Sequence, residues 1–293
     1  MSKPKRRHKK KLIITLLAIA AIGGFWYTIH DVKATNPDSK IEVMGADAAS
    51  HKERLTQLAE TDHVQLLQFA KDRFIAQQVN NYTWTMEKME KINGKRGSYQ
   101  TLNVKFTQKP FRVAIAVVKG ASNLSGDRML YVEGSYLDKD GRSQMIVRPT
   151  HGLFRLLADG SVSRLPDCAE VKKSSLRPIT DAGFISAYQN LIDVYQAARQ
   201  RGECVEKHGG FAKINGKSCI ILDRHIPVQR KDYPAKLTKI YLDIETLLPL
   251  RIVGWDWTGE EKPNCDYIYN DIKLNAPLTA SDFTPKANGI DKE

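Results

Sequence analysis

Apolar and polar residues alternate along much of this chain, and the alternation is clearest between residues 237 and 257. Two runs rich in β-forming residues are separated there by a short polar step. In the first run Thr238, Ile240 and Leu242 share one face, as expected for a strand with one buried side. The stretch therefore predicts a β-hairpin, in which Pro249 is tolerated because it lies near the start of the second strand.

Further strands are predicted on both sides of this hairpin. The dipeptides Asn93-Gly94 and Asn215-Gly216 each separate two such runs, a pattern typical of tight hairpin turns. We expect these strands to continue the same sheet. The predicted strands are 82–89, 102–106, 111–118, 129–134, 144–148, 154–157, 161–165, 210–214, 217–224 and 265–274.

Two stretches follow the period of an amphipathic helix instead. The first begins near Asp62, where Gln65 follows three residues later in an arrangement like a capping box. The second is capped by Thr180 and extends to about Gln200. A shorter helix is expected at 51–60. The apolar faces of the two longer helices consist of Leu66, Leu67, Ala70 and Phe74, and of Phe184, Tyr188, Leu191, Tyr195 and Ala198.

The order of these elements is helix, strands, helix, strands, and hairpins make most of the connections. This order predicts an α+β domain with an antiparallel sheet. We place the domain at residues 61–285, between a polar linker at 30–60 and a polar tail at 286–293.

The N-terminus combines a basic flank with an apolar segment. Residues 1–11 contain seven Lys and Arg and no acid, and residues 12–29 contain no charge. Because a basic flank is retained in the cytoplasm, the domain that follows should be exported. One expectation is an inner-membrane protein anchored through residues 12–29, a run just long enough to cross a bilayer, with its domain in the periplasm. The alternative is a signal peptide cleaved near Ala34, which leaves a soluble periplasmic protein.

The net charge of +12 is concentrated in that flank. The rest of the chain carries 38 basic and 33 acidic residues, without the clustering that nucleic-acid binding requires. We therefore expect no nucleic-acid partner.

Four cysteines lie in the part predicted to be exported. An even number in an oxidising compartment favours disulfides, and four cysteines allow three full connectivities. Cys168 and Cys204 flank the second predicted helix, and we favour this pair. Four buried free thiols are the alternative. No pair has C-x-x-C spacing, so neither a zinc site nor a thioredoxin-like site is predicted.

The sequence contains no familiar catalytic motif. G-x-S-x-G, the phosphate-binding P-loop and H-E-x-x-H are all absent. Asp243 and Glu245 are neighbours, but they fall in the predicted turn, where aspartate is a common turn former. We expect no enzymatic activity, metal or cofactor, although scattered histidines and carboxylates that converge in space would favour an envelope hydrolase.

Three segments resemble one bacterial envelope family, domain of unknown function 1571. They are QTLNVKFTQKPFRVAIAV, KIYLDIETLLPLRIVGWDW and CDYIYNDIKLNAPLTASDF, and the resemblance covers roughly residues 60–285. The chain is also similar to the wider superfamily of periplasmic lipoprotein carriers, outer-membrane lipoprotein receptors and sigma-factor regulators. The resemblance implies a curved antiparallel sheet, a half-barrel wrapped around helices, with a hydrophobic cavity that receives acyl chains in relatives.

Two functions fit this resemblance. In the first, the half-barrel binds an acyl chain, a lipoprotein or a similar amphiphile. In the second, the core is filled and the domain is an envelope interaction, sensor or scaffold module. The apolar positions that we take as candidate cavity lining, or otherwise as core, are Trp84, Met86, Phe106, Phe111, Val113, Ile115, Leu130 and Val132.

Overall fold

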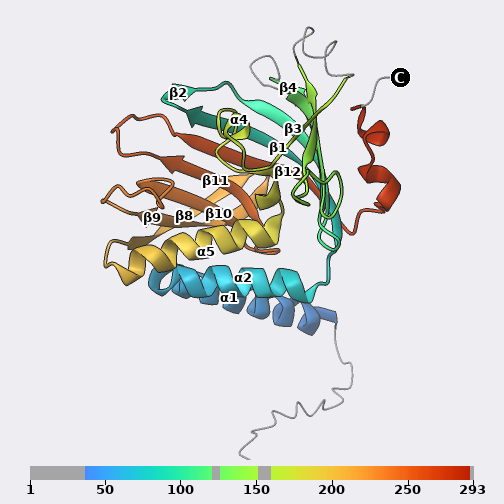
Figure 1. The fold of residues 1–293 in the computed structure, drawn as a ribbon. Helices are drawn as coiled ribbons and strands as arrows, with labels where there is room; N and C mark the ends of the chain where they lie inside the picture. Colours follow the sequence, from blue (N-terminus) through green and yellow to red (C-terminus); the bar gives the residue numbers. More distant parts are fainter. Residues whose placement is uncertain (1–36, 121–125, 151–159, 291–293) are drawn as a thin grey trace, which may run out of the picture. The chain divides into compact units, whose positions relative to one another are not determined.

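Twelve strands form one antiparallel sheet in the computed structural model, which describes residues 37–120, 126–150 and 160–290 (Figure 1). The chain divides into two units, residues 1–45 and 46–293, and the sheet belongs to the second. The strands are β1 (Asn81–Ile92), β2 (Lys95–Arg96), β3 (Gln100–Thr107), β4 (Arg112–Lys119), β5 (Gly126–Val132), β6 (Met145–Pro149), β7 (Val162–Arg164), β8 (Val205–Ile214), β9 (Lys217–His225), β10 (Leu237–Asp243), β11 (Pro249–Trp255) and β12 (Cys265–Leu274).

The first and last of these strands lie side by side in the middle of the sheet. The order across it is β7-β6-β5-β4-β3-β1-β12-β11-β10-β9-β8, with the short β2 paired to β1. Met86 of β1 lies opposite Tyr269 of β12. The sheet therefore consists of two meanders, β1 to β7 and β8 to β12, which the β1–β12 pairing joins.

The hairpins predicted at residues 237–257 and at Asn215-Gly216 are confirmed. Strands β10 and β11 pair antiparallel, and Ile240 and Leu242 are buried on one face. At the turn between β8 and β9, Asn215 and Gly216 have φ values of 51° and 81°. Two consecutive positive φ angles are what a type I′ hairpin turn requires, and asparagine and glycine reach them most easily. The predicted strand at 154–157 lies outside the described residues.

Two of the helices match the predicted amphipathic segments. In the first, the Asp62 carboxylate accepts the backbone N–H of Gln65 at 3.1 Å, as the capping pattern predicted. The apolar faces predicted for both are buried. The helices are α1 (Pro37–Thr61), α2 (His63–Ala76), α4 (Ala169–Lys172) and α5 (Phe184–Gln200), with 3-10 turns η2 (Ile179–Asp181), η3 (Ala280–Phe283) and η4 (Lys286–Asn288).

Two helix boundaries differ from the prediction. Helix α1 begins at Pro37, inside the segment 30–60 that we predicted to be a linker; proline suits the first position of a helix, because its φ is already helical. The residue that caps α5 is Gly183, not Thr180, which belongs to η2. A Cβ at Gly183 would lie 2.6 Å from the Phe106 ring, so close packing with β3 determines this helix start.

No helix within the described residues is both long and apolar enough for a membrane span. The predicted membrane or signal segment, residues 12–29, lies outside those residues.

The main core lies on the concave face of the sheet. Helices α2 and α5 pack together beneath the half of the sheet that contains β8 to β10 (Figure 1). The Tyr188 hydroxyl donates to the carbonyl of Leu247 at 2.8 Å and ties α5 to the β10–β11 turn. A smaller core lies on the opposite, convex face, where Phe283 and Ile290 of the C-terminal segment cover Leu130.

All four cysteines are free thiols, so the predicted Cys168–Cys204 disulfide is not formed. Cys168 precedes α4, whereas Cys204 follows α5 and lies 3.7 Å from Oε1 of Glu206. The 17 residues of α5 span about 25 Å. A disulfide requires Cα atoms within about 7 Å, and the chain does not fold back along α5 to bring the two residues together.

Candidate functional site

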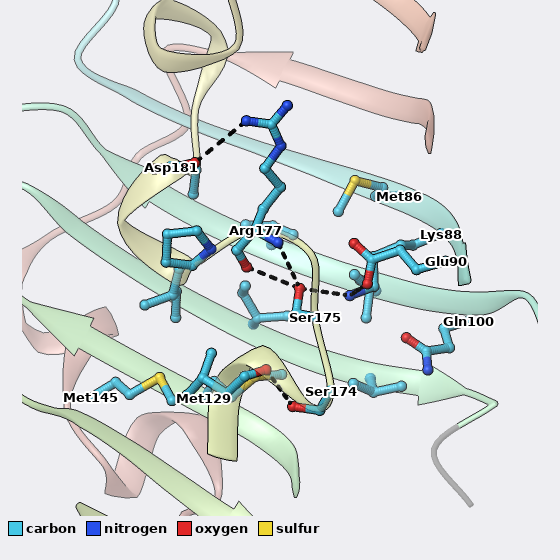
Figure 2. Close-up of a pocket in the computed structure, with 18 of the residues that line it drawn as sticks. Met86, Lys88, Glu90, Gln100, Met129, Met145, Ser174, Ser175, Arg177 and Asp181 are labelled. Carbon is cyan, nitrogen blue, oxygen red and sulfur yellow. Dashed lines mark hydrogen bonds and ion pairs between the residues drawn. The ribbon is translucent and has the colours of Figure 1, made fainter. Parts of the chain in front are cut away.

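A cavity of about 520 Å³ lies on the concave face of the sheet, beneath the segment 169–183 that contains α4 and η2 (Figure 2). Strands β1 and β3 to β7 form one wall, and residues of β11 and β12 and the first turns of α5 complete the enclosure. The apolar side chains that line it are Trp84, Met86, Leu102, Val104, Ile115, Val117, Met129, Met145, Val147, Val162, Val171, Ile179, Leu191 and Ile252.

Strand register aligns the apolar side chains of the wall. Trp84 lies opposite Val104, and Val104 lies opposite Ile115 on the next strand. Because residues two apart share a face, Met86 and Leu102 form a second row beside the first. The alternation that made these segments strands thus makes one continuous apolar wall.

The cavity exists because its cover is short. The 17 residues of α5 fill the core beneath β8 to β10, whereas α4 has only four residues. The segment 169–183 sends few apolar side chains inward, chiefly Val171 and Ile179. The Lys88 ammonium donates to Ser175 Oγ at 3.3 Å and connects this cover to the sheet. A concave wall opposite so small a cover leaves space that side chains do not fill.

Charged and hydroxyl groups lie at one end of the cavity. The Lys88 ammonium lies 3.0 Å from Oε2 of Glu90, whose side chain is buried. The Tyr267 hydroxyl donates to the other carboxylate oxygen of Glu90 at 2.7 Å. Burial raises the pKa of Tyr267 well above its usual value and raises the pKa of Tyr269 to about 12. Both phenols are therefore neutral at physiological pH.

A second polar group lies on the cover itself. Nη1 of Arg177 lies 3.7 Å from Oδ2 of Asp181, and the Asn190 amide donates to the same oxygen at 3.5 Å. The lining therefore carries two ion pairs, each already internally neutralised, and Arg164 and Glu170 add one charge of each sign. Neither ion pair places a free charge inside the cavity.

Apart from Oε2 of Glu90, which the Lys88 ammonium faces, two buried polar atoms of the lining have no hydrogen-bond partner among the described residues. They are the indole Nε1 of Trp84, a donor, and the side-chain Oε1 of Gln100, an acceptor. Buried polar atoms are nearly always paired, so unpaired ones in a cavity indicate where a ligand or water donates or accepts.

The eight predicted lining residues divide into three groups. Trp84, Met86 and Ile115 line the cavity. Phe106, Phe111 and Val113 belong to the main core but not to the cavity wall. Leu130 and Val132 lie on the convex face, against the C-terminal segment, and this corrects their assignment to the lining.

The physical reason for this last correction is that both faces of β5 are apolar. Met129 and Tyr131 pack on the concave core, and Leu130 and Val132 pack on the convex one. Alternation shows that these residues form a strand, but it cannot assign its faces when both are covered.

Sequence reasoning also missed several lining residues. Leu102 and Val104 were in a predicted strand, and their alignment with Trp84 was the signal that could have identified them. The contributions of Val171 and Ile179 had no such signal, because segment 169–183 shows neither the strand nor the helix period.

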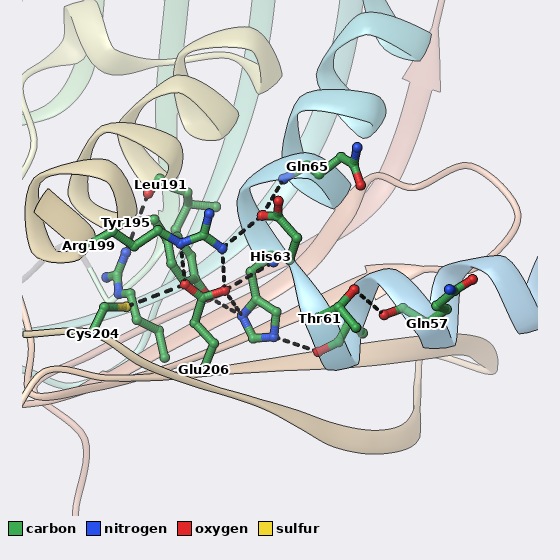
Figure 3. Close-up of polar contacts among 12 residues, drawn as sticks. Gln57, Thr61, His63, Gln65, Leu191, Tyr195, Arg199, Cys204 and Glu206 are labelled. Carbon is green, nitrogen blue, oxygen red and sulfur yellow. Dashed lines mark hydrogen bonds and ion pairs between the residues drawn. The ribbon is translucent and has the colours of Figure 1, made fainter. Parts of the chain in front are cut away.

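A second buried polar cluster lies where α1 ends and α2 begins (Figure 3). The fully buried His63 donates through Nε2 to the Ala59 carbonyl and accepts through Nδ1 from the Tyr195 hydroxyl, both at 2.8 Å. Burial lowers the pKa of His63 and keeps it neutral. Beside it, Arg199 donates to Glu206 at 2.6 Å. These groups satisfy one another, so the cluster joins α2, α5 and β8 and offers no open site.

No group of three or more His, Cys, Asp or Glu side chains able to hold a metal occurs in the part of the chain that the structure describes. What the cavity offers chemically is a large apolar surface, two unpaired polar atoms and a polar end.

Comparison with known proteins gives a family. Residues 79–289 match the family described as "Protein of unknown function (DUF1571)", which confirms the resemblance found in the strand and turn segments. None of the curated proteins compared with the chain matches it.

Solved structures also resemble the fold. A putative outer membrane lipoprotein-sorting protein domain from Vibrio parahaemolyticus is 12% identical, with a TM-score of 0.34, over 76% of this chain and 97% of that one. The Pseudomonas aeruginosa MucA/MucB complex gives 15% identity and a TM-score of 0.39, over 83% and 62%. Lipoprotein LppX from Mycobacterium tuberculosis gives 11% and 0.35, over 75% and 99%.

Proposed function

We propose, from the premise that this chain belongs to the DUF1571 family of proteins of unknown function, that it binds the apolar chain of an amphiphile and performs no chemistry on it. The observation that carries the proposal is the cavity of about 520 Å³ with its continuous apolar wall. Ligand pockets typically enclose about 300–1,000 Å³, so the space is adequate for one chain. Each methylene group transferred into it from water contributes about 0.8 kcal/mol.

The two unpaired polar atoms favour an amphiphile over a plain hydrocarbon. Trp84 Nε1 needs an acceptor and Gln100 Oε1 needs a donor. A buried polar group left without a partner costs about 1–3 kcal/mol, and an ester, amide or hydroxyl group of the ligand would remove that cost. We therefore assign the apolar wall to the chain and two places to polar groups of the ligand, namely Trp84 Nε1 and the end near Lys88 and Gln100.

The alternative function, an interaction or scaffold module, was predicted to have a filled core. The cavity supports the carrier over that alternative. We place the protein in the cell envelope because of the basic flank at 1–11 and the uncharged segment 12–29, which serves in this proposal as a membrane anchor.

Native mass spectrometry of the full-length chain, transferred from a detergent that is easily removed, tests the proposal. We expect a mass increment that organic extraction removes and that belongs to an amphiphile with at least one alkyl chain. A fluorescent fatty-acid analogue should then bind the extracted protein and be displaced by palmitate. Protein that carries no increment and does not bind the analogue would exclude the carrier function.

A further inference from the structure

A second groove, of about 660 Å³, crosses the convex face of the sheet, on the side opposite the cavity. The small side chains of Thr83, Thr85, Ala114 and Ala116 form its floor, and the C-terminal residues near Asn288 form one wall. These floor residues alternate with the cavity-lining residues of the same strands, so the two sites are separated by the sheet. The groove is thus independent of the proposed carrier function.

A β-bulge on β12 brings charge to this groove. Tyr267 and Tyr269 line the cavity on the concave face, and strict alternation would place Asp271 and Lys273 there too. The register between β1 and β12 shifts at Thr83/Thr85, and Asp271 has a left-handed φ of 49°. The extra residue reverses the faces, as bulges do, so that Asp271 and Lys273 line the convex groove.

Basic side chains form a row across the strands. Lys273 on β12 lies opposite Thr83 on β1, and Thr83 lies opposite Lys105 on β3. Two strands further on, Arg128 of β5 is displaced from this line by two residues along the strands, because it lies opposite Ala116 whereas Lys105 lies opposite Ala114. Because neighbouring strands are about 4.8 Å apart, the backbone positions that carry successive cations are about 10 Å or more apart across the sheet.

Part of this positive charge is not paired within the protein, although the carboxylate of Asp271 also lines the groove. Lys273 has no hydrogen-bond or ion-pair partner among the described residues, and Lys105 donates only to the neutral amide of Asn288, at 3.2 Å. Arg128 contacts backbone carbonyls and lies 3.8 Å from one Asp127 oxygen. The fourth cation of the lining, Arg148, is held by Asp127 and by the Gly289 carbonyl, which fixes the C-terminal wall.

The spacing of the cations determines the shape of the ligand. A single phosphate is held by donors that converge on one point, whereas these cations project from three different strands. Cations distributed in this way fit an extended anion that carries several charges. The strands of the floor lie inside the sheet and already pair on both sides, so they offer a peptide backbone no strand to join. The hydroxyls of Thr83 and Thr85 and the amide of Asn103 suit ligand hydroxyl groups instead.

We propose that this convex groove binds an anionic oligosaccharide, whose carboxylate or other acidic groups pair with Lys273, Lys105 and Arg128 while its hydroxyl groups meet the polar floor. Ala116 lies on β4, between the strands that carry Lys105 and Arg128, so its small side chain keeps the path of the sugar chain open.

Isothermal titration calorimetry of the full-length chain with hexagalacturonate tests the proposal, with neutral maltohexaose as the reference ligand. We expect binding of hexagalacturonate that weakens as salt rises, because screening shortens the range of the attraction, and no measurable binding of maltohexaose. The double variant Lys105→Gln/Lys273→Gln should weaken binding roughly fivefold to tenfold, the range for two exposed ion pairs. The variant Ala116→Trp should abolish binding while the melting temperature stays near that of the parent.

The matched control is Lys213→Gln/Lys231→Gln, which removes the same charge from exposed lysines outside the groove. It should bind as the parent does. Equal losses in the two double variants would show that only net charge matters and would overturn the site. Absence of hexagalacturonate binding, saturation by inorganic phosphate, or tighter binding of hexaglutamate would each overturn the assignment to an anionic oligosaccharide.

Discussion

Two residues of β4 provide a matched test of the cavity. Val113 and Ile115 lie on the same face, two positions apart, and Ile115 lines the cavity whereas Val113 does not. Val113 is fully buried in the main core. The variants Val113→Phe and Ile115→Phe both introduce an aromatic ring on one face of one strand. They differ in whether the ring meets packed side chains or empty space.

The expected magnitudes follow from this difference. In the packed core the ring of Val113→Phe overfills its site and should lower the free energy of unfolding by about 1–3 kcal/mol. For a domain of this size, each kcal/mol corresponds to roughly 2–4 °C in melting temperature. The ring of Ile115→Phe enters a cavity of about 520 Å³ and should leave the melting temperature within about 2 °C of the parent or above it.

Ligand binding should change in the opposite way. If Ile115→Phe displaces two methylene groups of a bound chain, the loss is about 1.6 kcal/mol, or roughly fifteenfold in affinity. Val113→Phe should retain the affinity of the parent wherever it remains folded. Thermal melts and titration with a fluorescent fatty-acid analogue measure both quantities. The reasoning is refuted if Ile115→Phe destabilises the protein as much as Val113→Phe does, or if it binds the analogue unchanged.

Three further predictions follow from particular groups. Burial holds the pKa of His63 in the folded protein below its ordinary value of 6.5. The stability that the neutral ring contributes is therefore present above about pH 6.5 and is lost as the pH falls from there through the folded-state pKa. The urea midpoint of unfolding should decrease from pH 7 to pH 5, and it should decrease less steeply in His63→Gln. A midpoint independent of pH would contradict this. All four cysteines are free thiols, so all four should react with iodoacetamide after the protein is unfolded without reductant. In the native protein Cys265 should react slowly, since burial raises its pKa to about 12. Peptide mapping that finds a disulfide would contradict the assignment of four free thiols. Trp84→Phe, which keeps the ring but removes Nε1, should weaken binding of a fatty-acid methyl ester more than binding of the matching alkane; equal losses would argue that Nε1 faces no ligand acceptor.

Short sequence patterns predicted the elements that are determined by residues close together in the chain. The turn at Asn215-Gly216 could be placed because few residues other than asparagine and glycine adopt its positive φ angles. The cap at Asp62 could be placed because a short carboxylate side chain reaches the free N–H groups of the next turn. Both features depend on residues within four positions of one another.

Features that depend on distant contacts could not be predicted in the same way. The C-terminal segment determines which side chains of β5 face the convex side, since Leu130 packs against Phe283. The start of α5 is selected by the ring of Phe106, close to Gly183. The cavity itself depends on how little of the concave wall the short α4 segment covers. The periodicity of apolar residues does not show whether a space between elements is left unfilled.

The pairing of β1 with β12 also determines how this protein reaches its native state. Glu90 and Tyr267, which are hydrogen-bonded across that pairing, are 177 residues apart in the chain. A contact this distant forms slowly, because a long loop must close before the contact contributes. Until β12 has been synthesised, β1 and β11 each expose an unpaired edge, the kind of surface on which chains aggregate. A chain truncated before Cys265 would keep both edges open, so we expect the nascent protein to depend on chaperones until its last strand is complete.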